Sequence, residues 1–289
     1  MHGFFVISGY LITISFTRSA SVGAFSMHRA LRILPGLLVV LLMMRVAWYI
    51  FDRFQPILHN GPLWTLSWEA VCYACVALLG VLGILQKRNF PVFFVCAWTI
   101  YLTNVSGDSE AVQIVAPMLM LFMGGAFIAI MEDSINVPKM AAISLPVLFI
   151  LFVPGMFTPT AEAIRSLGFA HGAPLSDWQV HEIPYLMTLP FAVIYVGKYI
   201  PSSIAIKHDL SYGIYIYGWP VATVIGYVFY NNVSPIRNPY LDFAIVLPVT
   251  LLFAIFSWFC VEKPALSFKR YLVGRAPAYQ TTDQKAGGV

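Results

Sequence analysis

Charged residues are scarce in this chain: only 10% of its 289 residues are Asp, Glu, Lys or Arg, while 59% are hydrophobic. A soluble domain carries roughly a quarter charged residues, so this chain has too few to cover a water-exposed surface. The scarcity excludes a soluble enzyme, a secreted disulfide scaffold, a nucleic-acid binder and a disordered protein. With a mean hydropathy of +0.78, the composition predicts an all-α, polytopic transmembrane bundle.

Cysteine is also rare, with four in the chain. Cys72 and Cys75 form a CxxC inside an apolar run, and Cys96 and Cys260 lie in two other apolar runs. This spacing does not supply the four ligands of a structural metal site. We therefore expect no metal and interpret the cysteines as small packing residues.

Long apolar runs are what the chain does contain, and each is long enough to cross much of a bilayer as a helix. We predict about nine spans, at residues 4–17, 31–51, 68–86, 90–104, 112–131, 140–157, 183–199, 210–230 and 241–262. Residues 1–273 would form one transmembrane domain. The polar tail, residues 274–289, is predicted to be disordered and cytoplasmic.

The few basic residues indicate the orientation of these spans. With the C-terminus in the cytoplasm, thirteen of the seventeen Lys and Arg residues fall on the cytoplasmic side, as the positive-inside rule requires. Arg53, Arg165 and Arg237 fall outside, and Arg45 lies within a span. An odd number of spans places Met1 outside, directly before a short helix. We therefore expect that an upstream helix is missing.

Two short motifs stand near the start of the chain. Residues 3–12 read GFFVISGYLI, in which Gly and Ser suit close helix packing. Arg29 and Arg32 lie three residues apart at a cytoplasmic helix start, so they share one helix face. They are interpreted either as a paired phosphate clamp or as simple positive-inside anchors.

Residues 63–69 read LWTLSWE and carry the most unusual carboxylate of the sequence. Trp64 and Trp68 suit the outer aromatic belt of a membrane protein. Glu69 begins an apolar helix, where a carboxylate is costly unless it is paired or faces a cavity. Glu69 is therefore either a functional group or the partner of Arg45 or Arg53 in a structural ion pair, and the sequence leaves both alternatives open.

Two proline-containing segments lie near the end of the chain. Residues 211–221 read SYGIYIYGWPV, where Pro220 predicts a kink or a break within a span. A broken helix at membrane depth is tolerated where it lines a cavity. Residues 261–264 read VEKP, and Pro264 is predicted to end the last helix.

In this order, the segments resemble the integral-membrane acyltransferase 3 family, bacterial proteins that O-acylate cell-surface glycans. The resemblance runs from Gly3 to about Arg270 and rests on FFVISGYLI, the arginine pair with Pro35, LWTLSWE, SYGIYIYGWPV and VEKP. The family has a core of ten helices. Its first helix, which carries an arginine and the proposed catalytic histidine, is not in this chain. Gly218 stands where many members have another histidine.

The resemblance implies an O-acyltransferase of the bacterial cytoplasmic (inner) membrane, and more narrowly an O-acetyltransferase with acetyl-CoA as its co-substrate. It would move an acyl group from cytoplasmic acyl-CoA to a hydroxyl of an extracytoplasmic glycan or lipid-linked sugar. Arg29 and Arg32 would bind acyl-CoA, and Glu69 would be an accessory group. The residues expected on the acceptor side are Trp64, Trp68, Tyr212 and Trp219. Without the family histidine, we expect the chain as written to be inactive.

Two other functions fit the composition. A multi-span transporter of small organic acids or glycan precursors suits a proline-broken helix, although no repeat or paired intramembrane charge supports it. A non-catalytic partner in polysaccharide assembly is the other. The predicted outer loop, residues 158–182, carries His171, Asp177, Trp178 and His181, which would contact an acceptor or simply lie in solvent.

Overall fold

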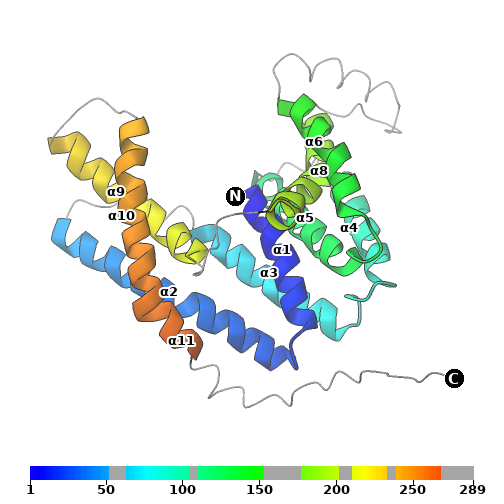
Figure 1. Cartoon of the computed structure of the whole chain (residues 1–289), viewed down its shortest axis with the longest axis horizontal. Coiled ribbons are helices and arrows are strands. Elements are labelled where there is room, and N and C mark those ends of the chain that lie inside the picture. Colours follow the sequence, from blue (N-terminus) through cyan, green and yellow to red (C-terminus); the bar gives the residue numbers. More distant parts are fainter. Residues whose placement is uncertain (52–62, 105–109, 153–176, 202–209, 233–238, 268–289) are drawn as a thin grey trace. The chain divides into compact units, whose positions relative to one another are not determined.

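The computed structural model describes residues 1–51, 63–104, 110–152, 177–201, 210–232 and 239–267, and in these ranges the regular structure is entirely helical (Figure 1). The elements are α1 (His2–Thr17), α2 (Val22–Phe51), α3 (Leu63–Val81), α4 (Phe90–Asn104), α5 (Glu110–Met131), α6 (Val137–Phe152), α8 (Asp177–Tyr199), α9 (Ser211–Asn232), α10 (Pro239–Ser257), the π-helical turn η2 (Trp258–Glu262) and α11 (Lys263–Ser267). The all-α prediction is confirmed.

Each predicted apolar run overlaps one of these helices, and residues 90–104 match α4 at both ends. Within the described part of the chain, three helical stretches are long and apolar enough to cross a membrane: Leu63–Val81, Gln113–Met131 and Tyr240–Ser267. Shorter apolar helices are His2–Thr17, Phe90–Thr103 and Val137–Phe152. Large apolar side chains such as Leu78, Phe149 and Leu252 are exposed on the helices, as expected where lipid is the solvent. The number of nine spans stays a prediction.

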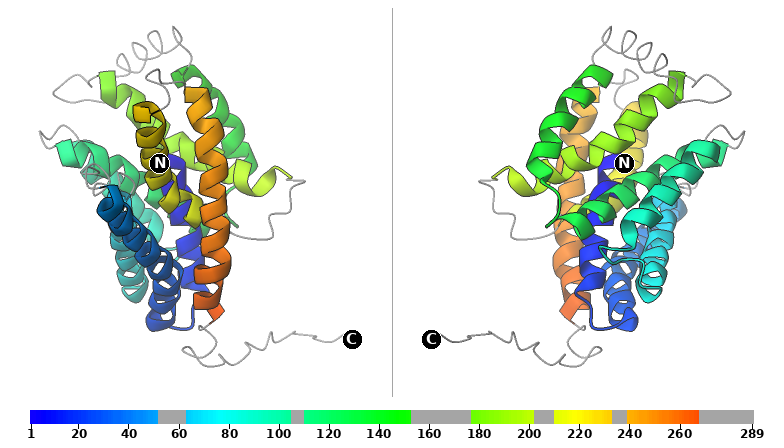
Figure 2. Two further views of the ribbon diagram at one scale, coloured as in Figure 1. Left: turned by 90° about the vertical axis from the view of Figure 1, so that its left-hand side faces the viewer. Right: turned by 90° about the vertical axis from the view of Figure 1, so that its right-hand side faces the viewer.

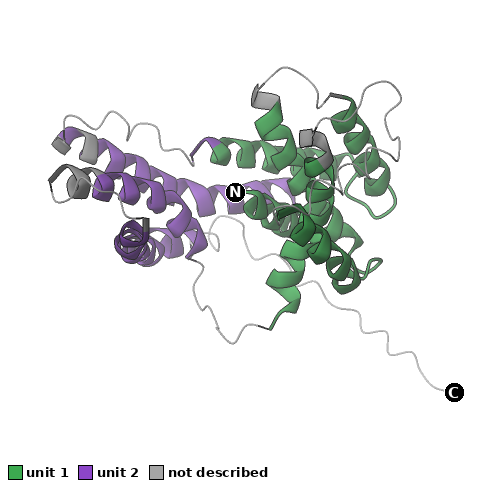
Figure 3. Cartoon of the chain, turned by 90° about the horizontal axis from the view of Figure 1, so that it is seen from above, with its two compact units in different colours: residues 1–18, 65–205 green, residues 19–64, 206–289 purple. Residues whose placement is uncertain are grey.

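The chain divides into two compact units, coloured separately in Figure 3. The first unit comprises Met1–Arg18 and Thr65–Ala205, and the second comprises Ser19–Trp64 and Ile206–Val289. The first therefore holds α1, α4, α5, α6, α8 and most of α3. The second holds α2, α9, α10, η2 and α11.

Glycine sets the closest helix contact of the first unit, between α1 and α5 (Figures 1 and 2). A Cβ atom on Gly9 would overlap the carbonyl of Phe122, and one on Gly125 would overlap the carbonyl of Val6. The two backbones therefore touch at a pair of glycines, which is how small residues join helices in membranes. Next to this contact, Phe90, Ala126, Ile130 and Met131 form a buried core between α4 and α5.

The second unit has its core between α2 and α9, where Val40, Met44, Ile216 and Tyr217 are buried together. Helix α9 continues through Pro220 to Asn232, so the alternative of a break is wrong, while the alternative of a kink stays a prediction. Helices α9 and α10 approach closely where a Cβ on Gly213 would lie 2.9 Å from the Cα of Ala254.

The prediction that Pro264 ends the last helix is also wrong, because helical structure continues to Ser267. The amide of Lys263 donates to the carbonyl of Trp258, five residues earlier, in a π-helical turn. This register ends the preceding helix just before Pro264, which then occupies the first turn of α11. A proline has no amide to donate, and the first turn of a helix is where that loss costs least.

Candidate active-site residues

Glu69 is a buried carboxylate in the first unit, and it lies in the second turn of α3. The Oγ of Ser8, on α1, donates a hydrogen bond to Glu69 Oε1 over 3.0 Å. The hydroxyl of Tyr73, one turn further along α3, donates to the same oxygen. Two hydroxyls from two helices therefore hold one carboxylate inside an apolar bundle.

This arrangement gives the carboxylate a physical role in the bundle. A buried charge is costly unless hydrogen bonds replace its water shell, and donors to an ionised group form the stronger bonds. The sequence singled out Glu69 but assigned Ser8 to helix packing, so it missed their pairing. A serine inside an apolar helix was the available signal. Of the two arginines considered as partners, Arg53 lies outside the described residues and Arg45 belongs to α2 of the second unit.

Trp64 and Trp68 lie one turn apart on α3, on the N-terminal side of Glu69. Trp64 is exposed and Trp68 is half-buried. An indole ring combines a large apolar face with one hydrogen-bond donor. The start of α3 thus presents aromatic surface next to a buried carboxylate.

The arginine pair lies on α2 in the second unit, and both side chains are half-buried. The Arg29 guanidinium stands over the ring of Phe25, 5.8 Å from its centroid. This cation–π contact limits the movement of the Arg29 guanidinium, which carries several hydrogen-bond donors. Arg32 follows three residues later, so the two guanidinium groups start from the same helix face.

Tyr212 lies beside this arginine turn. Its hydroxyl donates to the carbonyl of Ile33, over 2.7 Å, and joins the first turn of α9 to α2. The bond joins Tyr212 to the residue that follows Arg32; the expected role of Tyr212 on the acceptor side stays a prediction. Trp219, two turns along α9, is exposed.

The predicted outer loop, residues 158–182, is wrong at its C-terminal end. Residues 177–182 are part of α8 rather than a loop, and the half-buried His181 has its Nε2 3.3 Å from the carbonyl of Leu151 and its ring stacked on Tyr185. His171 lies outside the described residues, and only the backbone is described for Asp177 and Trp178. In the described ranges, no three His, Cys, Asp or Glu side chains gather as a metal site would require.

A second buried carboxylate, Glu262, was quoted in the sequence only as part of VEKP. The Oγ of Ser257 donates to its Oε1 over 2.9 Å, and both side chains are buried in the second unit. The π-helical turn between them brings the two side chains together. Such turns occur frequently at functional sites.

Most of the chain matches one known protein family. Residues 1–260 match the acyltransferase domain family that defines acyltransferase 3 proteins. The chain belongs to the acyltransferase 3 family. The match includes Ser8, Glu69 and both arginines of α2, and it ends two residues before Glu262.

Two relatives of this acyltransferase 3 protein carry functional names. It is 26% identical over 310 residues to an O-acetyl transferase of Shigella phage Sf6, covering 91% of this chain and 83% of the relative. It is 23% identical over 329 residues to nodulation protein 10 of Rhizobium leguminosarum bv. viciae, covering 94% and 83%. No solved structure matches the chain significantly. The family implies a membrane protein that uses an acyl donor and an acceptor.

Proposed function

We propose that this acyltransferase moves an acyl group, in the simplest case acetyl, from cytoplasmic acyl-CoA to a hydroxyl of an extracytoplasmic glycan or lipid-linked sugar. The observation that carries the proposal is the family match over residues 1–260, which takes in both the arginine pair and Glu69. The O-acetyl transferase among the relatives supports acetyl as the group transferred.

Arg29 and Arg32 are the proposed donor site. Acyl-CoA is a polyanion, and a guanidinium binds phosphate through two parallel hydrogen bonds. The two side chains start from one face of α2, and the stacking of Arg29 on Phe25 limits the side-chain freedom that phosphate binding would otherwise remove. Tyr212 supports this turn through its bond to Ile33, so we propose it as a positioning residue of the donor side.

Glu69, Trp64 and Trp68, all on α3, are the proposed acceptor site. Sugars present hydroxyl groups at their edges and apolar C–H groups on their faces, which suit a carboxylate and an indole ring respectively. Trp64 and Trp68 lie close to Glu69 on α3. Trp219 is exposed on α9 of the second unit and is a separate candidate for contact with the acceptor. Glu69 is proposed as an accessory group, held in one rotamer by Ser8 and Tyr73.

The reaction transfers one acyl group from the sulfur of acyl-CoA to a hydroxyl oxygen of the acceptor. The acceptor oxygen forms a bond to the acyl carbon, the carbon–sulfur bond of acyl-CoA breaks, and the hydroxyl proton passes to a base before the CoA thiolate is protonated. The residues described here bind the donor, orient the acceptor and exclude water around a buried carboxylate.

Donor binding tests this proposal with labelled acetyl-CoA and the full chain in lipid nanodiscs. Wild-type protein should bind it saturably. The double variant Arg29→Lys/Arg32→Lys keeps both positive charges but loses the bidentate geometry, so its affinity should fall about tenfold or more. Arg88→Lys is the matched control, because Arg88 is an exposed residue between α3 and α4, and its affinity should equal that of the wild type.

The lysine variants also separate donor binding from simple membrane anchoring. An anchor needs only positive charge, so unchanged affinity in Arg29→Lys/Arg32→Lys would contradict the phosphate clamp. Absence of saturable binding to the wild type would contradict the transferase. Acetyl-CoA-independent uptake of organic acids by vesicles would instead favour a transporter.

A further inference from the structure

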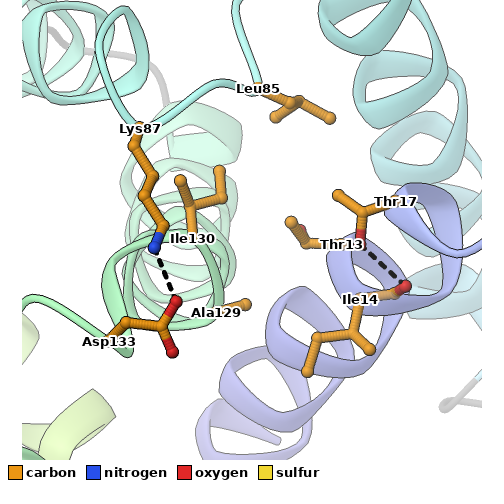
Figure 4. A pocket seen from close by; sticks show the side chains of 8 residues that line it. All are labelled: Thr13, Ile14, Thr17, Leu85, Lys87, Ala129, Ile130 and Asp133. Carbon is orange, nitrogen blue, oxygen red and sulfur yellow. Dashed lines mark hydrogen bonds and ion pairs between the residues drawn. The ribbon is translucent and has the colours of Figure 1, made fainter. Parts of the chain in front are cut away.

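A small cavity lies in the first unit, away from Glu69. Its volume is about 230 Å³ and its lining comes from three places: the last turns of α1, the turn between α3 and α4, and the end of α5 with the second residue after it. The lining residues are Thr13, Ile14, Thr17, Leu85, Lys87, Ala129, Ile130 and Asp133. Figure 4 shows the α1 residues on one side of the space and Lys87 with Asp133 on the other.

Thr13 brings an unsatisfied hydroxyl to this cavity. Its side chain is 1% exposed, and its Oγ1 has no hydrogen-bond partner among the residues that the structure describes. A threonine in a helix usually bonds the carbonyl three or four residues earlier, as Thr17 does to Ile14 at 3.0 Å. A buried hydroxyl without a partner destabilises the fold, so a polar group that enters the cavity and bonds Thr13 would be stabilised there.

The cavity also holds one charge of each sign. Lys87 Nζ and Asp133 Oδ2 form an ion pair of 2.6 Å at its rim, and both side chains are largely exposed. An ion pair this exposed contributes little to stability, so a ligand that offers a partner to each group can separate them at small cost. The remaining walls, from Ile14, Leu85 and Ile130, are apolar.

The location of the cavity is that of a membrane interface. The apolar helices α1 and α5 end beside it. Lys198, at the end of α8, pairs with Glu132 next to Asp133. Basic side chains at the ends of apolar helices lie at the level of lipid headgroups. A ligand here would meet charged groups towards the water and apolar walls towards the bilayer.

We propose that this cavity binds the phosphoethanolamine headgroup of a membrane phospholipid. The phosphate would accept hydrogen bonds from Lys87 Nζ and Thr13 Oγ1, and the ammonium would donate to Asp133. A zwitterion matches a lining that carries one cation and one anion, whereas the polyanionic CoA would face the carboxylate of Asp133. The site is distinct from the proposed donor and acceptor groups.

Native mass spectrometry of the purified full chain tests the proposal without any transfer reaction. Phosphatidylethanolamine, phosphatidylcholine and phosphatidylglycerol are added at equal concentration. Phosphatidylcholine keeps the phosphate but its quaternary amine cannot donate to Asp133, and phosphatidylglycerol has no amine. We expect retention of phosphatidylethanolamine to exceed that of the other two lipids about tenfold.

Variants locate this preference in the cavity. Thr13→Val is isosteric and Asp133 is exposed, so Thr13→Val and Asp133→Asn should both fold, and each should abolish the preference for phosphatidylethanolamine. Thr99→Val is the matched control, because the hydroxyl of Thr99 bonds its own helix at Val95, and it should keep the preference. Preference that survives Thr13→Val and Asp133→Asn would overturn the assignment.

Three other outcomes would also overturn it. Equal retention of the three lipids would mean that the amine is not recognised. Binding of free phosphoethanolamine without retention of the lipid would identify a soluble ligand instead. Displacement of the lipid by acetyl-CoA in wild type but not in Thr13→Val would make the cavity part of the donor site.

Discussion

The hydrogen bond from Ser8 to Glu69 joins α1 to α3, and together with the bond from Tyr73 it stabilises the buried carboxylate. The sequence identified Glu69 because a carboxylate in an apolar run is unusual. It did not identify Ser8 as its donor, because a serine between apolar residues is equally suited to packing. Which helices meet is a tertiary property, and the order of residues along each helix does not contain it.

We predict that Ser8→Ala destabilises the protein by about 1–3 kcal/mol, because it removes a donor from a buried carboxylate. Thermal unfolding in detergent measures the loss. In a double-mutant cycle with Glu69→Gln, the coupling energy should be about 1 kcal/mol or more. Thr99→Val, whose hydroxyl bonds only within α4, serves as the control. Additive effects of Ser8→Ala and Glu69→Gln would contradict a direct bond.

Glu132 makes a second residue-scale prediction, on pH dependence. It accepts a hydrogen bond from Tyr10 over 2.8 Å and pairs with Lys198. Burial works to raise the pKa of Glu132, but the hydrogen bonds from Lys198 and Tyr10 and the charge of Lys198 together hold the pKa below its ordinary value of 4.5. The carboxylate therefore stabilises the fold above about pH 4.5, and this contribution is lost as the pH falls through the lowered pKa.

The measurement is the melting temperature of wild type and Glu132→Gln across the pH range. The wild type should be the more stable of the two, by a constant margin, from about pH 5.5 to 8, and the margin should shrink as the pH falls below about 4.5. Asp133→Asn is the comparison, because Asp133 is fully exposed where it pairs with Lys87, and its margin should be small. A margin for Glu132→Gln that grows on acidification would contradict the pairing.

At the scale of the elements, the α1–α5 contact depends on glycine. Gly9→Ala should destabilise the protein by about 1–3 kcal/mol, because the added methyl overlaps the backbone at Phe122. Gly197→Ala is the matched control: a Cβ there meets nothing within 4 Å, so this change should stabilise α8 by up to about 1 kcal/mol. Unfolding in denaturing detergent compares the two, and equal effects would mean that helix propensity alone decides.

The helices themselves were largely predictable, and the exceptions have physical reasons. Apolar run length defines where a helix can lie in a bilayer, which is why residues 90–104 match α4. Helix α3 begins at Leu63, five residues earlier than predicted, because aromatic and polar residues such as Trp64 and Thr65 continue a helix beyond its apolar centre. The helix continues through Pro264 because a π-helical turn precedes it. The residues of that turn, WFCVE, form an ordinary apolar run, so the sequence did not predict the turn.

At the scale of the whole molecule, the charge distribution predicts an orientation in the membrane. Single cysteines at Lys139 and Tyr240, in a chain whose four native cysteines are alanine, should differ in reaction with an impermeant thiol reagent applied to intact cells. Both positions are exposed in the structure. Tyr240→Cys should react directly, whereas Lys139→Cys should react only after the membrane is permeabilised. The reverse pattern would invert the topology.

The donor residues are proposed to lie on the cytoplasmic side of the membrane and the acceptor residues on the other side. Binding of the donor to vesicles of opposite orientation is the direct test. Labelled acetyl-CoA is added to sealed vesicles of both orientations that carry the same amount of the protein. We expect saturable binding to inside-out vesicles, where Arg29 and Arg32 face the added donor, and none to right-side-out vesicles. Binding only to right-side-out vesicles, or to neither kind, would contradict it.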